Sequence, residues 1–442
     1  MENMDIQSTS STQIGNSKNI GEKLFNLIKQ LYPICRSITG DGLRKSLQII
    51  KNRIPVEIHE LPTGTKAFDW AIPKEWNIND AWIKNSKGEK IVDFNQSNLH
   101  VLNYSIPVDK ILTVEELKEH LYTIPEQPAL IPYRTSYYKE QWGFCLTHNQ
   151  FISLPEDNYH VFIDSTLEKG SMTYGELFIE GKTKQEVLIS CHICHPSLCN
   201  DNLSGVSVAV HLAEFLLNKE LRYSYRFLFI PGTIGSIAWL SQNEKKVGTI
   251  KYGLVLSCVG DPSDVTYKKS RRGDAEIDRI VERVLTDSNE QYEIRDFVPY
   301  GYDERQFCSP AFNLPVGCFM RTPFGEFPEY HTSADNLDFV TPEALADSFS
   351  TLKEVINVIE NNNMYLNLNP KCEPNLGKRG LYKLIGGDTE DEIDQMAILW
   401  VLNLSDGDHD LLDIAQRAEI SFDKIKRAAE ALWDVNLLKK VS

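Results

Sequence analysis

The stretch CHICHPSLCNDNLSG, residues 191–205, constrains the fold of this chain more than any other segment. It follows the apolar run EVLIS, residues 186–190, which is typical of a short strand in the core of an α/β sheet. Rigid backbone at the C-terminal end of such a strand is where open α/β sheets place their ligands. His195 and Asp201 offer an imidazole nitrogen and a carboxylate oxygen, which are ordinary zinc ligands. The stretch therefore predicts a metal site at one edge of a sheet.

His192 and three cysteines in the same stretch are weaker candidate ligands. His192 alone is equally well explained as a histidine that happens to lie in a loop. Cys191, Cys194 and Cys199 interleave with the histidines, but no second Cys/His pair follows at zinc-finger spacing, so we expect no structural zinc knot. The chain has nine cysteines, and this odd number fits reduced thiols better than a disulfide framework.

The composition excludes several classes of protein. The formal net charge of −16 argues against nucleic acid and anionic membranes as partners, because both need a basic surface. No apolar run approaches the ~20 residues that a membrane span requires. The N-terminus has neither the basic start nor the apolar core of a secretory signal, so we expect a disordered tail over residues 1–18. These features predict a cytoplasmic protein that does not contact a membrane.

The order of the predicted elements divides the chain into parts. Residues 19–55 and 135–362 form a main α/β domain, in which strands alternate with helices. Its predicted core strands are EVLISCH, YRFLFIPG, GLVLSCVG and LPVGCFMR. Residues 56–134 consist of short β-rich pieces separated by Pro, Gly and Asn, which predicts a small inserted β-rich domain. Residues 361–377 are rich in Asn and Pro and predict a linker.

Residues 378–442 predict a winged-helix-like domain. Three helical patterns, at Glu392–Leu404, Leu411–Ala418 and Ser421–Leu432, have the size found in a helix-turn-helix, and the last residues could form a small wing. This region carries 9 Lys/Arg against 13 Asp/Glu, so we do not expect it to bind DNA. A protein partner or a second copy of the chain is the partner that we expect for it.

Two residues far along the chain share the sequence context of His195 and Asp201. Asp261 follows the strand GLVLSCVG, and His331 lies in PEYHTSADNLDFV after a Pro-rich loop. A hydrolytic zinc needs about three protein ligands and one free position, and separate strand ends can supply them. Asp261 is better explained, taken alone, as a turn aspartate before a proline. Asp335 lies close to His331 in sequence. This spacing is typical of a carboxylate that orients a metal-bound imidazole, so we expect Asp335 to orient His331.

Segments along nearly the whole chain resemble the zinc exopeptidase superfamily. DNLSG, HTSADNLD and YDERQF are similar to the DNASG-like, HTxxD-like and SDHxxF-like segments of its aminopeptidase-like members. More closely, YPICRSITGDG, CHPSLCNDNLSG, PGTIGSIAWL, RRGDAEIDR and EFPEYHTSADNLDF resemble a bacterial family of aminopeptidase-like-domain proteins with an inserted β domain and a C-terminal winged helix. The resemblance implies an α/β fold with a mixed twisted sheet flanked by helices. It also implies a zinc-dependent aminopeptidase-like hydrolase that cleaves an amide bond in a small peptide or an aminoacyl conjugate.

The resemblance also implies roles for individual residues. Asp201 becomes the central ligand, which bridges the ions if two bind, and His195 is favoured over His192 as a ligand. His331 is a further ligand, and Asp261 is the extra carboxylate for a second ion, so one or two Zn²⁺ are implied. Asp303, in YDERQF, corresponds to a carboxylate of the proton-relay network in related cyclases. Its neighbour Glu304 is expected to be an exposed salt-bridge partner.

One departure from the family pattern bears on activity. The chain reads PGTIGSIAWL where the family pattern is PETIGSIAYL, so Gly232 stands in place of a glutamate. In the superfamily, a glutamate in this region is a general base or a metal ligand. Loss of a general base typically costs a factor of about 10² to 10⁴ in rate. We therefore expect a weakened hydrolase or, alternatively, a catalytically inactive metal-binding or scaffold protein. Glu326 and Glu329, near His331, are the alternatives for the missing carboxylate.

Overall fold

The computed structural model describes residues 6–381 and 394–441, and it divides into two compact units. The first unit contains the chain up to Ala275 together with Tyr292–Phe349, and the second contains Glu276–Gln291 and the chain from Ser350 onward. In the described part of the chain, no helix combines the length and the apolar character needed to cross a membrane.

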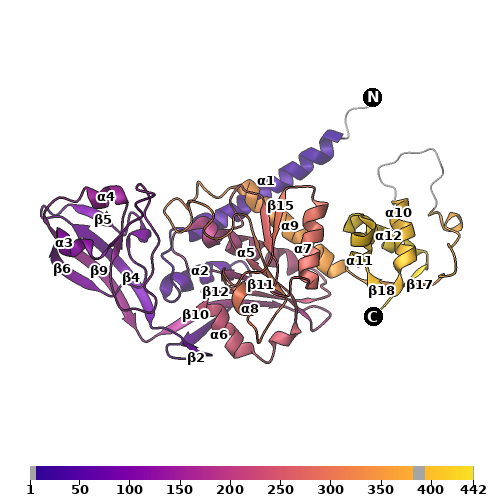
Figure 1. Cartoon of the computed structure of the whole chain (residues 1–442), viewed down its shortest axis with the longest axis horizontal. Coiled ribbons are helices and arrows are strands. Elements are labelled where there is room, and N and C mark those ends of the chain that lie inside the picture. The colour runs from indigo at the N-terminus through magenta and orange to yellow at the C-terminus, as the bar shows by residue number, and fades with distance from the viewer. Residues whose placement is uncertain (1–5, 382–393, 442) are drawn as a thin grey trace. The chain divides into compact units, whose positions relative to one another are not determined.

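An eight-stranded mixed sheet forms the centre of the first unit (Figure 1). In spatial order its strands are β1 (Glu57–Pro62), β10 (Ser171–Ile179), β12 (Ser224–Ile230), β11 (Glu186–His192), β13 (Ile250–Leu256), β16 (Val316–Met320), β14 (Val265–Lys268) and β15 (Tyr292–Arg295). The four strands β12, β11, β13 and β16 are mutually parallel, and they are the four core strands that the sequence predicted. Their carboxyl ends therefore lie along one edge of the sheet.

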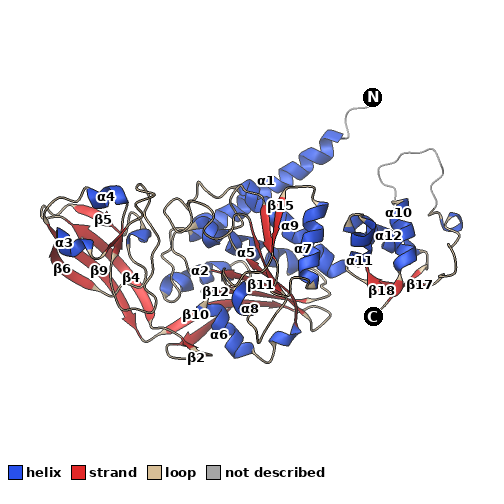
Figure 2. Ribbon diagram, viewed as in Figure 1, coloured by secondary structure: helices blue, strands red, loops and turns tan. Residues whose placement is uncertain are grey.

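Helices cover this sheet on both sides (Figure 2). The first unit contains α1 (Ile6–Leu31), α2 (Asp41–Lys51), α5 (Gly205–Leu216), α6 (Ile234–Asn243), α8 (Glu304–Phe307) and the first part of α9 (Pro342–Asn361). Leu188 of β11 and Ile230 of β12 pack in one cluster with Trp239 of α6 and Phe307 of α8. Helix α5 packs against β11, β12 and β13. Because every residue of β11 is buried, its sequence lacks the apolar–polar alternation of a half-exposed strand.

Helix α1 begins earlier than the sequence predicted. We expected a disordered tail through residue 18, whereas the helix runs from Ile6, and only residues 1–5 of that tail lie outside the described residues. Leu24, Leu27, Ile28 and Leu31 are fully buried and anchor its C-terminal part. Once an anchored turn has formed, each further residue extends the helix at low cost, so an amphipathic pattern does not mark where the helix starts.

The inserted β-rich domain is confirmed as a sheet, but its predicted boundaries are wrong at both ends. Its four-stranded antiparallel sheet has the order β5 (Lys90–Asp93), β4 (Glu75–Lys84), β9 (Asn158–Glu168) and β6 (Val108–Thr113). Strand β9 thus lies beyond residue 134, where we expected the main domain, whereas β1 lies within 56–134 and pairs with β10 of the main sheet. An alternating pattern identifies a strand without specifying the sheet that it joins.

Shorter elements accompany the insert. They are β2 (Lys66–Ala67), β3 (Trp70–Ala71), α3 (Val114–Lys118), β7 (Leu121–Tyr122), β8 (Phe144–Cys145) and α4 (His148–Ile152). Trp76 and Ile83 of β4 pack with Val161 and Ile163 of β9 in a buried cluster. The same cluster includes Cys194 and Ile234, so the insert shares its apolar core with the main domain.

The second unit has the winged-helix-like arrangement that the sequence predicted. It contains α7 (Glu276–Asp287), the end of α9, β17 (Met364–Asn367), α10 (Gln395–Leu404), β18 (Asp406–Asp410), α11 (Leu411–Ala418), α12 (Phe422–Asp434) and β19 (Leu438–Lys440). The helices α10, α11 and α12 pack together, and β17 lies between β18 and β19 in a small sheet. The predicted linker 361–377 was wrong in part, because it contains β17. Residues 392 and 393 of the first predicted helix lie outside the described residues.

Candidate metal centre

The DNLSG segment holds Asp201 in a tight, fully buried turn after β11. Residues Cys199–Ser204 form a kinked turn, in which Asp201 and Asn202 have non-helical backbone angles, and this turn leads into α5. The carboxylate of Asp335 accepts hydrogen bonds from the backbone nitrogens of Cys199 at 3.1 Å, Asn200 at 2.6 Å and Asp201 at 2.9 Å. We had predicted that Asp335 orients the imidazole of His331, and the structure instead assigns it to this backbone. Asp335 therefore fixes the position of Asp201 rather than that of a histidine.

The same turn is tied to the neighbouring strand β13. The Asn202 amide donates to the carbonyl of Leu256 at 2.9 Å and accepts from the backbone nitrogen of Cys258 at 3.1 Å. A Cβ at Gly205 would lie 2.5 Å from the Leu256 carbonyl oxygen, so only glycine fits at this close approach. The hydrogen bonds of Asn202 therefore hold the turn after β11 against the end of β13.

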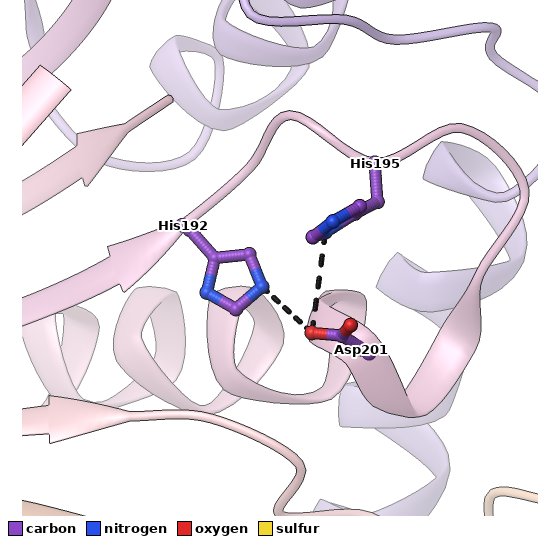
Figure 3. A group of neighbouring side chains, drawn as sticks. All are labelled: His192, His195 and Asp201. Carbon is purple, nitrogen blue, oxygen red and sulfur yellow. Dashed lines mark hydrogen bonds and ion pairs between the residues drawn. The ribbon is translucent and has the colours of Figure 1, made fainter. Parts of the chain in front are cut away.

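Three imidazoles surround the carboxylate of Asp201. His192 Nε2 lies 2.7 Å from Oδ1, and His195 Nδ1 lies 3.9 Å from the same oxygen (Figure 3). His331 Nε2 lies 3.0 Å from Oδ2. His192, His195 and Asp201 are buried, whereas His331 is about one-third exposed. The ligand atoms of the three buried residues all lie within 4.8 Å of one another, which is the spacing of a metal-binding group.

Electrostatics favour a charged Asp201 carboxylate beside a neutral His195 imidazole. Burial raises the pKa of Asp201, but His195, His192 and the hydrogen bonds from the imidazoles outweigh it, so the pKa lies well below its usual range. Burial lowers the pKa of His195 well below that of a free histidine, although Asp201 opposes this shift. A carboxylate and neutral imidazoles are the protonation states that bind a metal ion.

A buried arginine supports the loop that carries His195. Arg36 is 1% exposed, and its guanidinium donates to the carbonyls of His195 at 2.8 Å, Pro196 at 3.3 Å and Leu31 at 2.5 Å. Burial lowers the pKa of Arg36 to about 10. Removing a guanidinium from water is costly unless hydrogen bonds replace the water, so these bonds to carbonyls hold the His195 loop in one place.

The sequence favoured His195 over His192 as a metal ligand, and no pattern in it singled out Tyr302. The ring of Tyr302 lies against His192, with the centroids 3.7 Å apart, and its hydroxyl is 3.5 Å from His195 Nε2. Burial, followed by the charges of Cys194 and Asp201, raises the pKa of Tyr302 well above its usual value, so the phenol keeps its proton. The signal for His192 was its position as the last residue of a buried strand. For Tyr302 the sequence held no comparable signal.

Tyr302 fills the space beside Gly232. A Cβ built on Gly232 would lie 1.8 Å from Cε1 of Tyr302, and the Tyr302 hydroxyl is 3.5 Å from the Gly232 carbonyl oxygen. The glutamate of the family pattern therefore could not replace Gly232 while Tyr302 keeps this position. Of the two alternative carboxylates, Glu326 is exposed and paired with Arg295, with Oε1 2.5 Å from Nη1, and Glu329 is half-buried.

Asp261 is not brought into the cluster. Its carboxylate accepts hydrogen bonds from the Asn200 amide at 3.0 Å, from the backbone nitrogen of Ser263 at 3.1 Å and from the backbone nitrogen and hydroxyl of Thr322 at 3.2 and 2.8 Å. These four donors occupy both of its oxygens. Asp261 has the surroundings of a structural aspartate, which was the alternative explanation of this residue in the sequence.

Asp303 and Glu304 differ although they are neighbours. Asp303 Oδ1 accepts from the Ser236 hydroxyl at 2.7 Å, its Oδ2 is buried without a hydrogen-bond partner in the described part of the chain, and burial raises its pKa to about 7. Glu304 pairs with Lys268, with Oε1 2.5 Å from Nζ. The salt bridge agrees with our prediction, but the expected exposure was wrong, because Glu304 is fully buried.

Two family models cover most of the chain. A model described as a domain of unknown function, DUF4910, matches residues 25–362, and a winged helix-turn-helix model matches residues 363–440. The chain belongs to the DUF4910 family. One relative in Clostridium acetobutylicum is 56% identical over 428 residues, which are 97% of this chain and 98% of the relative. Its provisional name is polysaccharide biosynthesis protein with aminopeptidase-like domain.

Solved structures agree with this assignment. A provisionally named peptidase from C. acetobutylicum has a TM-score of 0.93 at 55% identity and covers 98% of this chain and 99% of its own. BSAP, a zinc aminopeptidase from Bacillus subtilis, has a TM-score of 0.55 at 13% identity and covers 77% of this chain and 94% of its own. An M28 peptidase precursor from Shewanella amazonensis has the same TM-score at 12% identity, with 80% and 97% covered. The last two likenesses show the fold, so the predicted zinc exopeptidase-like α/β fold is confirmed. The family model and the C. acetobutylicum relative confirm the predicted family.

Proposed function

We propose that this chain is a zinc-dependent, aminopeptidase-like hydrolase of an amide bond in a small peptide or an aminoacyl conjugate. The observation that carries the proposal is the buried carboxylate of Asp201, which has imidazoles of His192 and His331 within 3.0 Å and that of His195 within 3.9 Å. Nitrogen and oxygen donors of this kind are the usual ligands of catalytic zinc.

The residues present fit a zinc ion. His195 Nδ1 is buried and has no hydrogen-bond partner among the described residues, which is costly unless the nitrogen has another partner such as a metal. His192, His195, Asp201 and His331 would hold the ion. Because the carboxylate of Asp261 is fully engaged elsewhere, these ligands support one ion rather than two. When bound, zinc polarises a carbonyl or acidifies a water molecule.

Residues around the cluster would position and protonate the reacting groups. Tyr302 keeps its phenolic proton beside His195 and can donate a hydrogen bond to a substrate oxygen. Asp303 has a pKa of about 7, so it can hold or release a proton near neutral pH. This property supports the proton-relay role that the resemblance implies for Asp303.

A binding protein without turnover is the second candidate function. The observation that favours it is the pair of Gly232 and Tyr302, because an aromatic ring occupies the place of the expected glutamate. Such a chain would keep the metal ligands and lose the general base. It would bind the same class of substrate and release it unchanged.

Zinc analysis and a hydrolysis assay distinguish these candidates. We expect about one zinc per chain in protein purified without chelators, and slow release of the N-terminal residue from small peptides or aminoacyl anilides. Stoichiometric zinc with no turnover would support the binding protein. Absence of zinc from every preparation, including protein incubated with zinc, would contradict both candidates.

We also propose that the C-terminal winged helix contacts protein, either a partner or a second copy of this chain, rather than DNA. All three basic residues of α12 are engaged by acidic ones: Lys424 lies 3.2 Å from Asp394, Lys426 lies 3.9 Å from Glu430, and Arg427 lies 2.8 Å from Asp423. A recognition helix needs free basic side chains for phosphates. Salt-sensitive binding of the full chain to duplex DNA would contradict this proposal.

A further inference from the structure

The segment YPICRSITGDG, residues 32–42, lines a second pocket outside the metal cluster. Arg36 within it supports the His195 loop, but most of the other residues of the segment face a cavity of about 560 Å³. This volume lies within the range of about 300–1,000 Å³ that is typical of small-molecule sites. The metal centre therefore leaves most of this segment without an assigned role.

Three parts of the first unit form the walls of this pocket. The segment at residues 32–42 forms one wall, and β4 with the turn after β5 forms the second. Ser197, two residues after His195, closes the third side. Its hydroxyl donates to the carbonyl of Tyr32 at 2.7 Å and accepts from the Asn98 amide at 2.8 Å. The pocket thus has fixed walls, and one of them is the loop that carries a candidate metal ligand.

The lining is polar but almost uncharged. Five amide side chains face the cavity, from Asn77, Asn79, Asn95, Gln96 and Asn98. Hydroxyl-bearing residues add to them, and the two charged lining residues, Asp41 and Lys45, have opposite signs. A site for an anion or a cation would carry an excess of opposite charge. Many neutral donors and acceptors in a pocket fit a neutral ligand with several hydroxyl groups.

Two features leave room for such a ligand. Four of the five amides already bond to the protein, as Asn77 does to the backbone nitrogen of Asp41 at 2.7 Å, but an amide has two donor and two acceptor positions and none of the four uses them all. The Gln96 amide and the Ser97 hydroxyl have no hydrogen-bond partner in the described parts of the chain, so both are available to a ligand. Phe94 and Ile78 add apolar surface against which the C–H groups of a sugar ring can pack.

We propose that this pocket binds a neutral carbohydrate. The site is separate from the metal cluster and depends neither on bound zinc nor on hydrolysis, so it goes beyond the function proposed above. Its ligand would contact the Ser197 wall, and through it the loop that Arg36 and Asn98 hold in place.

Calorimetric and saturation-transfer NMR titrations of the full chain test this proposal. The probes are glucose and N-acetylglucosamine, with the charged analogues glucuronate and glucosamine beside them. We expect saturable binding of at least one neutral sugar at millimolar concentration and weaker binding of its charged analogue. Gln96→Ala should weaken binding by about fivefold, which is the value of one hydrogen bond. Ser97→Trp should abolish binding by filling the cavity.

The control is Gln242→Ala, which changes an exposed glutamine of α6 and should leave sugar binding unchanged. Thermal unfolding and zinc content of each variant report whether its fold and its metal centre persist. Binding of no neutral sugar, tighter binding of a charged analogue, or undiminished binding by both Gln96→Ala and Ser97→Trp would overturn the proposal. None of these results would bear on the hydrolase proposal.

Discussion

Two neighbouring strand ends of the same sheet carry different parts of the proposed hydrolytic site. Strand β11 ends at His192 and leads into the loop and turn that bring His195 and Asp201 together. Strand β12 ends at Ile230 and leads to Gly232, where the ring of Tyr302 occupies the space of a side chain. In the proposed site, metal binding and proton transfer therefore depend on separate strand ends, so one can change without the other.

The largest expected effect is loss of the metal from the β11 side. Asp201→Ala removes the carboxylate that all three imidazoles approach, which is also the one anionic group among the four candidate ligands. We therefore expect zinc content to fall from about one per chain to below detection. Metal analysis after gel filtration measures this. The matched control is Asp261→Asn, which should retain zinc. Equal loss in both variants would return Asp261 to the ligand set.

The next effect concerns the β12 side. The double variant Gly232→Glu, Tyr302→Ser restores a carboxylate and removes the ring that blocks it, and we expect turnover to rise by about 10² to 10⁴. Steady-state hydrolysis of aminoacyl anilides measures it.

The two single variants sharpen this test. Gly232→Glu alone should lower the melting temperature, because its Cβ would lie 1.8 Å from the Tyr302 ring. Tyr302→Ser alone should give no comparable gain in turnover, because it adds no carboxylate. If that single variant were as active as the double variant, the role assigned to the glutamate would be wrong.

A smaller effect on zinc affinity tests whether His192 is a ligand beside His195. His192→Ala removes one of the four candidate ligands. Zinc sites in proteins gain about 10–16 kcal/mol from the metal, so an equal share for each ligand is about 3 kcal/mol. We therefore expect His192→Ala to lower the zinc affinity roughly 10²-fold. Competition with a chelator measures this change. His211→Ala is the control, because His211 is also buried but bonds to the carbonyl of Ser207 at 2.8 Å. Unchanged affinity in His192→Ala would leave His195 as the ligand that the resemblance favoured.

The smallest effect concerns the pH dependence of stability. Asp303 has a folded pKa of about 7, above the value of about 3.9 in an unfolded chain. The unfolded state therefore loses this proton first as pH rises, and stability falls between about pH 4 and pH 7. Asp303→Asn should remove that loss, with a gain of about 1–4 kcal/mol at pH 8 relative to pH 4. Urea unfolding at several pH values measures it.

The neighbouring carboxyl provides the contrast. Glu304→Gln leaves the ammonium group of Lys268 buried without its carboxylate, so it should destabilise the fold by about 3–5 kcal/mol at neutral pH. A pH-independent response of Asp303→Asn would show that the Asp303 carboxyl is not protonated in the folded chain.

The sequence predicted where helices and strands occur better than it predicted which of them lie side by side. The four parallel core strands and the helix over residues 411–418 were readable because apolar periodicity is a local property. The sheet to which β9 belongs was not, since its alternation fits either sheet. Strand β17 was hidden in an Asn- and Pro-rich stretch that predicted a linker.

The same limit applies to the candidate site. His195, Asp201 and His331 stand beside turn residues, so their sequence contexts pointed to a common sheet edge. Asp335 and Tyr302 act through contacts with residues more than 100 positions away, and no local pattern encodes such contacts. Asp261 has the sequence context of a ligand, but its hydrogen-bond donors come from Asn200 and Thr322, which only the fold brings near.

Anomalous diffraction at the zinc edge from crystals of this chain tests the central claim most directly. The account predicts one strong peak bounded by the imidazoles of His192, His195 and His331 and the carboxylate of Asp201, with no second peak at Asp261. Absence of a peak from crystals soaked in zinc, or a peak at another group of residues, would contradict it.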